Sequence, residues 1–277
     1  MQQTLAHDYN LAPHAATRPA LEVNQLSAGY PSDRYAVENL SFTVQRGERV
    51  AIIGPNGAGK STMFKAIVGL IPFTHGEISI HGEDCRTSHS MVGYVPQHEA
   101  IDWSFPVTVT DVVMMGRTRQ IGWFRLPGSN DRVAVHDILE MLGLSHLAKR
   151  QIGELSGGQK RRVFIARALA QQTDILLMDE PFTGVDSTAE QEIMAVLDVL
   201  TEQNITILLA THNMNRAAEH FGSMLLMNRC NMAYGPPSEV LKPEVLRQAY
   251  SSAVRVVQDG TETLIIADEH GHAHGLD

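Results

Sequence analysis

The sequence predicts an α/β fold with a mostly parallel sheet and helices on both of its faces. Short, wholly apolar runs alternate along the chain with amphipathic helical patterns. The runs have the length and composition of strands that are covered on both sides. They occupy residues 50–53, 175–178, 205–210 and 224–227. Neighbouring strands of this kind need helical crossovers, and the intervening patterns supply them.

Two crossover helices are predicted by apolar residues at i, i+3, i+4 and i+7. The first pattern consists of Val135, Ile138, Leu139 and Leu142, and Gly143 follows it. The second consists of Ile193, Val196, Leu197 and Leu200. We expect the second helix to begin with a capping box formed by Ser187 and Glu190.

The extent of this alternation divides the chain into three expected parts. Residues 1–19 are polar and are predicted to be disordered. Residues 20–245 form one large domain with a helix-rich part at about 98–170. Residues 246–277 form an extension with a hairpin around Asp259 and Gly260, and they end in a tail with His270, His272 and His274. Short β segments are expected to flank the first βα unit, at 21–45, 76–82 and 92–95.

Composition excludes several classes of protein. The net charge of −9 and the pI near 5.8 argue against nucleic acid as a main partner. Cys85 and Cys230 lie far apart and match no zinc or disulfide spacing. The N-terminus does not resemble a signal peptide, and no apolar run approaches the roughly 20 residues of a membrane span. We therefore expect a chain without its own membrane segment.

A glycine-rich loop directly follows the run at 50–53 and precedes a helical stretch. It fits the pattern G-x-x-x-x-G-K-[ST], whose glycines turn backbone N–H groups toward phosphate oxygens. Lys60 would reach the β- and γ-phosphates of a nucleotide, and the Ser61 hydroxyl would coordinate Mg²⁺. The cradle consists of Gly54, Pro55, Asn56, Gly57, Ala58, Gly59, Lys60, Ser61 and Thr62. The alternative is a chance glycine turn.

Two adjacent carboxylates end the apolar run at 175–178. Asp179 would hold Mg²⁺, directly or through water. Glu180 would point the other way along the pleat and would orient and deprotonate the attacking water. An apolar strand that ends in Asp-Glu is common on its own, but after a phosphate-binding loop it indicates a nucleotide-hydrolysing site.

A third motif begins a helical stretch at 160–170 with Leu155, Ser156, Gly157, Gly158 and Gln159. A Ser-Gly-Gly opening on a helix is a second anion site, although alone it would read as a capped flexible loop. Together with the two motifs above, it resembles the signature of ATP-binding-cassette (ABC) ATPases over residues 20–240. The resemblance implies a P-loop NTPase (RecA-like) core, an N-terminal antiparallel β subdomain and a helical subdomain. It also implies hydrolysis of ATP with Mg²⁺.

The resemblance assigns roles to four further residues. Gln97 matches the glutamine that touches Mg²⁺ and water, and Asp186 matches the D-loop aspartate. His212 matches the histidine that contacts the γ-phosphate. Tyr30 matches the aromatic residue that stacks on adenine, with Tyr35 as a competitor. Without the resemblance these would be a surface Gln, a helix N-cap, a buried hydrogen-bonded His and a strand Tyr.

Partners also follow from the resemblance. Two copies would form a head-to-tail dimer, in which Ser156, Gly157, Gly158 and Gln159 close on the ATP of the other subunit. Membrane permease subunits would dock on the segment from Gln97 to Arg125. The chain would lie peripherally at the cytoplasmic face of the bacterial inner membrane.

The docking segment suggests the cargo. Its start, HEAIDWSFPVTV at 98–109, resembles ATPase subunits of bacterial manganese, zinc and iron importers, which also work with an external metal-binding protein. Trp103 and Phe105 are either core residues or part of the permease groove. The histidine tail is weak support for metal binding. The alternatives are an exporter subunit and a non-transport ABC ATPase.

Overall fold

The computed structural model describes residues 18–97, 106–122, 124–250, 254–259 and 262–267. Within these ranges, no helix is long and apolar enough to cross a membrane. Several expectations lie outside them: the disorder of 1–17, the environment of Trp103 and Phe105, and the histidine tail.

A six-stranded sheet forms the centre of the protein, with the strand order β10-β9-β3-β8-β7-β6. Its strands are β3 (Arg49–Ile53), β6 (Val92–Val95), β7 (Ile175–Asp179), β8 (Thr206–Ala210), β9 (Ser223–Asn228) and β10 (Cys230–Gly235). All neighbours pair in parallel except β10, which is antiparallel to β9. The predicted α/β class with a mostly parallel sheet is confirmed.

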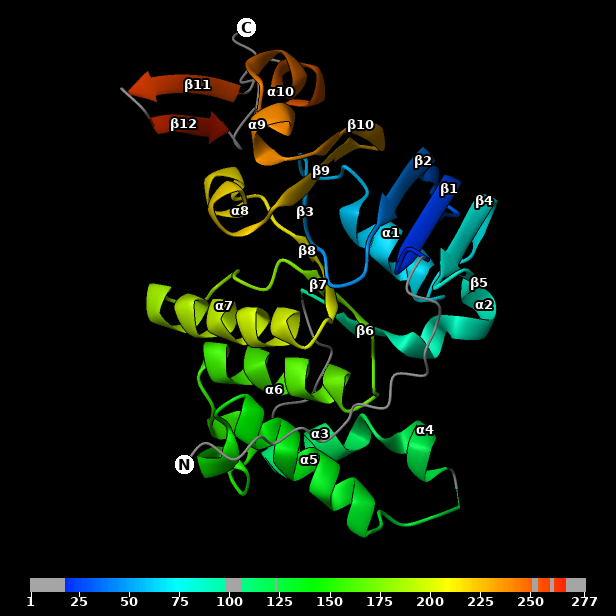
Figure 1. The fold of residues 1–277 in the computed structure, drawn as a ribbon, viewed down its shortest axis with the longest axis vertical. Coiled ribbons are helices and arrows are strands. Elements are labelled where there is room, and N and C mark those ends of the chain that lie inside the picture. The colour runs from blue at the N-terminus through cyan, green and yellow to red at the C-terminus, as the bar shows by residue number, and fades with distance from the viewer. Residues whose placement is uncertain (1–17, 98–105, 123, 251–253, 260–261, 268–277) are drawn as a thin grey trace, which may run out of the picture.

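A second sheet is antiparallel and lies to one side of the first (Figure 1). It has the order β2-β1-β4-β5, with β1 (Leu21–Tyr30), β2 (Asp33–Val44), β4 (Phe73–Ile80) and β5 (Glu83–Asp84). One expectation is wrong here. The first strands are long rather than short, at 10 and 12 residues. The short strand expected at 92–95 is confirmed as β6, which joins the central sheet by pairing in parallel with β7.

Alternate residues of the central strands face two different cores. Val50 and Ile52 of β3 join the core that contains the antiparallel sheet and α1 (Lys60–Ile67). Ala51 and Ile53 face the opposite core, which is built from helices. Strands buried on both faces explain why the sequence runs there are wholly apolar. The helix α1 contacts both sheets and thereby fixes the loop that precedes it.

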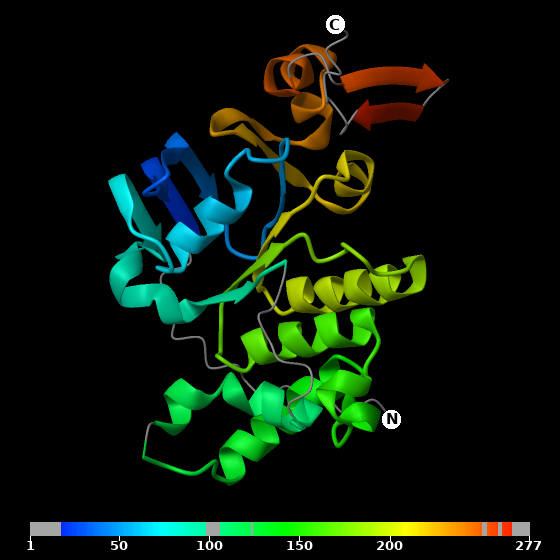
Figure 2. The same cartoon turned by 180° about the vertical axis from the view of Figure 1, so that it is seen from behind.

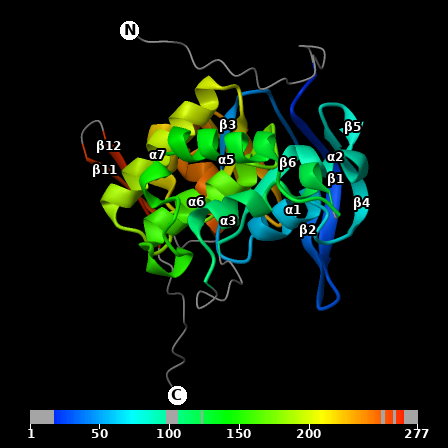
Figure 3. The same ribbon diagram turned by 90° about the horizontal axis from the view of Figure 1, so that it is seen from below.

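The helical part packs on the other face of the central sheet, with α6 and α7 nearest to it (Figure 2). Its helices are α3 (Val109–Met115), α4 (Thr118–Ile121), α5 (Ser129–Met141), α6 (Gly157–Leu169) and α7 (Ser187–Glu202). Viewed from below, α3 and α5 cover α6 (Figure 3). Both predicted amphipathic helices are confirmed as α5 and α7, and their predicted apolar residues are buried.

The start of α7 differs from the expectation. Its N-cap is Asp186, whose carboxylate accepts a hydrogen bond of 2.8 Å from the N–H of Ala189. The predicted capping box of Ser187 and Glu190 is therefore wrong by one residue. Ser187 is the first helical residue, and Glu190 forms an ion pair with Arg216 instead. Both Asp and Ser are good N-caps, so composition alone does not choose between them.

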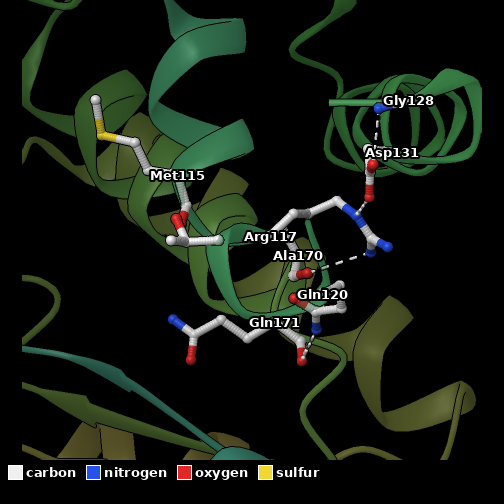
Figure 4. A network of polar contacts seen from close by, with 8 residues as sticks. Met115, Arg117, Gln120, Gly128, Asp131, Ala170 and Gln171 are labelled. Atoms are coloured by element: carbon white, nitrogen blue, oxygen red, sulfur yellow. Dashed lines mark hydrogen bonds and ion pairs between the residues drawn. The ribbon is translucent and has the colours of Figure 1, made fainter. Parts of the chain in front are cut away.

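A polar network joins three helices of this part (Figure 4). Arg117, which is buried, donates to Asp131 of α5 at 2.8 Å and to the carbonyl of Ala170, at the end of α6, at 3.4 Å. The hydrogen bond from Arg117, together with one from the N–H of Gly128, lowers the pKa of Asp131. The side chain of Gln120 donates to the carbonyl of Gln171 at 2.8 Å. These bonds tie the far end of α6 to α5.

The remaining elements complete the chain. They are α2 (Cys85–Ser88), the 3-10 helices η1 (His89–Met91), η2 (Ser145–Leu147) and η3 (Ile152–Glu154), α8 (Met214–His220), α9 (Pro237–Val240), α10 (Pro243–Tyr250), β11 (Val254–Asp259) and β12 (Glu262–Ala267). The last two pair antiparallel, in the range where the sequence predicts a hairpin.

Candidate nucleotide-binding site

A pocket of about 550 Å³ opens where strands of the central sheet end. Ligands of open α/β sheets bind in this place, outside the carboxyl ends of the strands. The pocket is lined by Tyr30, Asp33, Ala36, Asn56, Gly57, Ala58, Gly59, Lys60, Ser61, Thr62, Gln97, Asp179, Glu180, Thr183 and His212. Residues predicted from separate motifs thus meet in one cavity.

The glycine-rich loop joins the end of β3 to the first turn of α1. Gly59 is the N-cap of α1 and has φ +93°; a Cβ there would lie 2.4 Å from the carbonyl oxygen of Ala36. Gly54 also has no room for a side chain, because a Cβ added there would lie 2.1 Å from the carbonyl oxygen of Met227. Glycine is therefore required at both positions by conformation and by close packing.

Lys60 also lines the pocket. Its side chain is buried, and Nζ donates to the carbonyl oxygens of Gly54 at 2.7 Å and Pro55 at 3.2 Å. These contacts hold the ammonium group inside the loop. Among the described residues no side chain caps the N-terminus of α1, so the N–H groups of its first turn are available to an anion.

Asp179 ends β7 and is 3% exposed. Its Oδ2 accepts a hydrogen bond of 3.4 Å from the hydroxyl of Tyr94 on β6. The other oxygen, Oδ1, is buried and has no hydrogen-bond partner within the described part of the chain. A buried, unpaired carboxylate oxygen is costly, so its presence in a pocket that Ser61 also lines points to a cation ligand.

Glu180 does not continue the strand as expected. Its φ of +46° places it in the left-handed region, and its N–H donates to the Ala210 carbonyl at 2.9 Å. The alternation of a pleated strand therefore stops at Asp179, and both carboxylates line the same pocket. The prediction that Glu180 points away from Asp179 is wrong for this reason. Such a backbone conformation in a Glu is uncommon and is found most often at functional sites.

The carboxylate of Glu180 is paired with His212. The distance from Oε2 to Nδ1 is 2.8 Å, and the His212 side chain is half exposed whereas that of Glu180 is 11% exposed. A proton on Nδ1 makes the ring the donor, which orients both groups toward the cavity. Strands β7 and β8 are neighbours, so the residues that follow them meet at this edge.

Gln97 and Tyr30 also line the pocket. Gln97 follows β6, the strand beside β7, and is half-buried. The hydroxyl of Tyr30 lies 3.4 Å from Nζ of Lys65, which also lies 5.9 Å from the ring centroid. Tyr35 is 53% exposed and does not line the pocket. The structure therefore places Tyr30 rather than Tyr35 at the cavity.

The signature residues lie elsewhere, at the start of α6. The Ser156 hydroxyl accepts from the N–H of Gln159 at 3.3 Å, and the Gln159 side chain accepts from the N–H of Ser156 at 3.1 Å. Ser156 and Gly157 are exposed, whereas Gly158 is buried against Ala189 of α7. Asp186 is also exposed and caps α7. One chain does not bring these residues into its own pocket.

Sequence reasoning missed three residues that line the pocket: Asp33, Ala36 and Thr183. Asp33 and Ala36 lie at the start of β2, shortly after Tyr30, and no motif covers these positions. Thr183 lies in the turn after Glu180, and its spacing from the two carboxylates is the signal that could have found it.

Comparison with known proteins places these features in a family. Residues 37–183 match the family described as ABC transporter. The chain belongs to this family. It is also 41% identical to the manganese transport system ATP-binding protein MntB of Halalkalibacterium halodurans, over 90% of this chain and 98% of that protein.

Two further relatives are named for other cargoes. The zinc transport system ATP-binding protein TroB of Treponema pallidum is 40% identical over 88% of this chain and 91% of its own length. YfeB of Yersinia pestis, named as part of a chelated iron transport system, is 41% identical over 86% of this chain and 81% of its own length. MJ1267, an ATP-binding cassette of an ABC transporter solved in its ADP conformation, has a TM-score of 0.74 and 26% identity, covering 85% of this chain and 100% of that one. The chain is thus an ABC ATPase domain, and the nucleotide it binds is ATP.

Proposed function

We propose that this chain is the ATP-hydrolysing subunit of a bacterial importer for divalent metal ions, with manganese, zinc or iron as cargo. Residues 20–245 would form the ATPase domain and 246–277 its extension. The observation that carries the hydrolytic role is the 2.8 Å contact of Glu180 with His212, beside the phosphate-binding loop. The cargo is supported by the names of relatives that are about 40% identical over most of the chain.

ATP binding is assigned to the loop and to α1. The uncapped N-terminus of α1 and the Lys60 ammonium group face the same cavity and favour polyphosphate. Lys60 would exchange its carbonyl partners for the β- and γ-phosphates. Tyr30, at the cavity wall, would stack on the adenine ring. The first contacts with ATP would therefore come from one chain, before a second copy closes on the nucleotide.

Mg²⁺ fits the oxygen atoms that the pocket offers. Asp179 has a buried oxygen with no hydrogen-bond partner among the described residues, and Ser61 and Gln97 line the same cavity. Hard cations prefer such carboxylate, hydroxyl and amide oxygens. When bound, Mg²⁺ would neutralise part of the phosphate charge. The Tyr94 hydroxyl holds the other oxygen of Asp179 and so orients the carboxylate.

Glu180 would orient the attacking water and accept its proton. Its carboxylate is largely buried, and the left-handed backbone aims it into the cavity that Lys60 also lines. His212 holds that carboxylate through Nδ1, which leaves Nε2 as the ring nitrogen able to contact the γ-phosphate. Positioned proton transfer of this kind accelerates reactions by about 10²–10⁴-fold.

The exposed start of α6 would close on the ATP of a second copy. Ser156, Gly157, Gly158 and Gln159 lie outside the pocket of their own chain, yet an exposed helix N-terminus is an anion site. The resulting head-to-tail dimer would carry Asp186 at its interface. Permease subunits would dock around Gln97–Arg125 at the cytoplasmic face of the inner membrane, and an external protein would deliver the metal.

Reconstitution with the permease and the metal-binding protein tests this function. In vesicles, external Mn²⁺, Zn²⁺ or Fe²⁺ bound to its delivery protein is expected to raise ATP hydrolysis and to accumulate inside. The Glu180→Gln complex is the control, and it should do neither. Metal leaving the vesicles on addition of ATP would identify an exporter instead. Stimulation by no metal would contradict the assigned cargo.

A further inference from the structure

Arg161 lies one turn into α6 and is buried, with 8% exposure. Its guanidinium donates to two backbone segments that end at the nucleotide pocket. On one side, Nη1 donates to the Pro96 carbonyl at 2.7 Å and Nη2 to the Gln97 carbonyl at 3.2 Å. The side chain therefore holds the segment that carries Gln97 into the pocket.

On the other side, the same guanidinium holds the turn after β7. Nε donates to the Pro181 carbonyl at 3.1 Å, and Nη2 reaches the Glu180 carbonyl at 3.4 Å. The backbone of Glu180 is thus held from two directions, since its N–H donates to Ala210. Glu180 needs such support because its left-handed conformation is unfavourable for a residue with a side chain.

Arginine has the geometry for this arrangement. Its planar group presents five donors in a fixed fork, so one side chain can bond several carbonyl groups that diverge from it. Lysine offers three donors from a single atom, and glutamine offers two. Neither can bond both segments in the same way.

We propose that Arg161 is a positioning residue for ATP hydrolysis, one that ties the start of α6 to the backbones of Gln97 and Glu180. The inference rests on the proposed function and adds a role to it. The exposed end of α6, which would meet one ATP, is linked through Arg161 to the residues that act on another. Arg161 itself does not line the pocket, so it acts through these two residues.

Two variants and one control test this role in the full-length chain. Arg161→Gln and Arg161→Lys remove the fork, and Arg162→Gln removes a neighbouring guanidinium that pairs with Glu192 of α7 at 2.8 Å. For each, kcat is measured well below the melting temperature, with the Kd for ATP from a fluorescent analogue. Displacement of Gln97 or Glu180 should lower kcat. It should not weaken ATP binding, which the glycine-rich loop and α1 provide.

We expect Arg161→Gln to lower kcat by about tenfold or more and to leave the Kd within about threefold of the native value. The kcat of Arg161→Lys should lie between the kcat of the native protein and that of Arg161→Gln. Arg162→Gln should melt earlier but keep its kcat. If Arg161→Gln does not fold, Arg161→Lys decides by the same two measurements.

Three outcomes would overturn the proposal: a folded Arg161 variant with native kcat, a Kd that weakens in parallel with kcat, or failure of both variants to fold. An equal loss of kcat in Arg162→Gln would do the same, because it would show general damage to α6. The assigned ATPase site is tested separately: the native chain should hydrolyse ATP, and the Lys60→Ala variant should not. A native chain with its partners that hydrolyses no ATP would overturn both.

Discussion

The N-termini of α1 and α6 both resemble anion sites, but the two helices differ in how side chains cap their first backbone N–H groups. At α1 the N-cap is Gly59, and among the described residues no side chain caps the first turn. At α6 the side chains of Ser156 and Gln159 form a complete capping box. One helix start is left open inside a pocket, and the other is closed at an exposed surface.

The difference indicates how each site is completed. The α1 site has its cation and its carboxylates in the same chain, so phosphate can take the place of a cap. The α6 start is capped by its own side chains, and in the proposed dimer a second copy would supply the nucleotide. An open, buried helix end is costly without a ligand, whereas a capped one is stable alone.

Lys60→Ala should have the largest effect, because it removes the cation from the open site. We expect ATP hydrolysis to fall by about 10³-fold and ATP binding to weaken, since the charge facing the phosphates is lost. Phosphate release and nucleotide titration measure the two effects. Lys149→Ala, at an exposed Lys of the helical part, is the control and should match the native protein. Normal hydrolysis in Lys60→Ala would contradict the assigned site.

Glu180→Gln should separate binding from turnover. The amide keeps the shape of the side chain but accepts no proton, so kcat should fall by about 10²–10⁴-fold while ATP remains bound. Gel filtration with ATP should then show a stable dimer, because the bridging nucleotide is not consumed. Glu202→Gln, at an exposed position of α7, should behave as native. A Glu180→Gln chain that stays monomeric with ATP would argue against closure of two copies on the nucleotide.

Gly157→Asp should damage only the α6 site. A Cβ at Gly157 meets no atom closer than 3.7 Å, so the change is tolerated by the fold, whereas at Gly158 it would lie 2.3 Å from the Cβ of Ala189. Mixed with Lys60→Ala, it should restore up to about a quarter of native activity, because half of the dimers are mixed and one of their two sites is intact. Either variant alone should be inactive. Mixtures that recover nothing would count against action in trans.

Measured on the isolated chain without nucleotide, Ser156→Ala should have the smallest of these effects, a modest loss of stability. Loss of the cap at α6 should cost about 1 kcal/mol, which thermal denaturation of the isolated chain would show. Ser61→Ala is the matched change at α1. It removes a hydroxyl that takes no part in capping that helix, so without nucleotide it should not alter the melting temperature. Equal destabilisation by both would remove the distinction between the two helix starts.

Much of the site could be predicted because its chemistry is local. The loop that carries Lys60, the strand that ends at Asp179 and the helix that starts at Gly157 each combine a motif with its own secondary structure. Short-range patterns of this kind can be recognised without knowledge of the tertiary fold. The two amphipathic helices were predictable for the same reason, since the period of their apolar residues marks the buried face.

The errors and omissions arise where contacts between segments distant in sequence determine the local structure. The turn at Glu180 depends on the carbonyl of Ala210 and on the side chain of Arg161. The role of Arg161 depends on two segments that approach it only in the folded chain. The strand at 92–95 takes its place from pairing with β7. No period or motif within a single segment encodes these contacts.

The helix α6 is bonded near both of its ends, by Arg161 to the nucleotide pocket and by the Ala170 carbonyl to Arg117. Its 13 residues span about 20 Å, so one rigid rod sets the spacing between the pocket and the outer helices. The two attached groups must also keep their relative orientation around the helix axis. One residue inserted between them would turn the far end by about 100° and lengthen the rod by only about 1.5 Å. The helix would survive such a change, but its two ends would no longer point toward their partners.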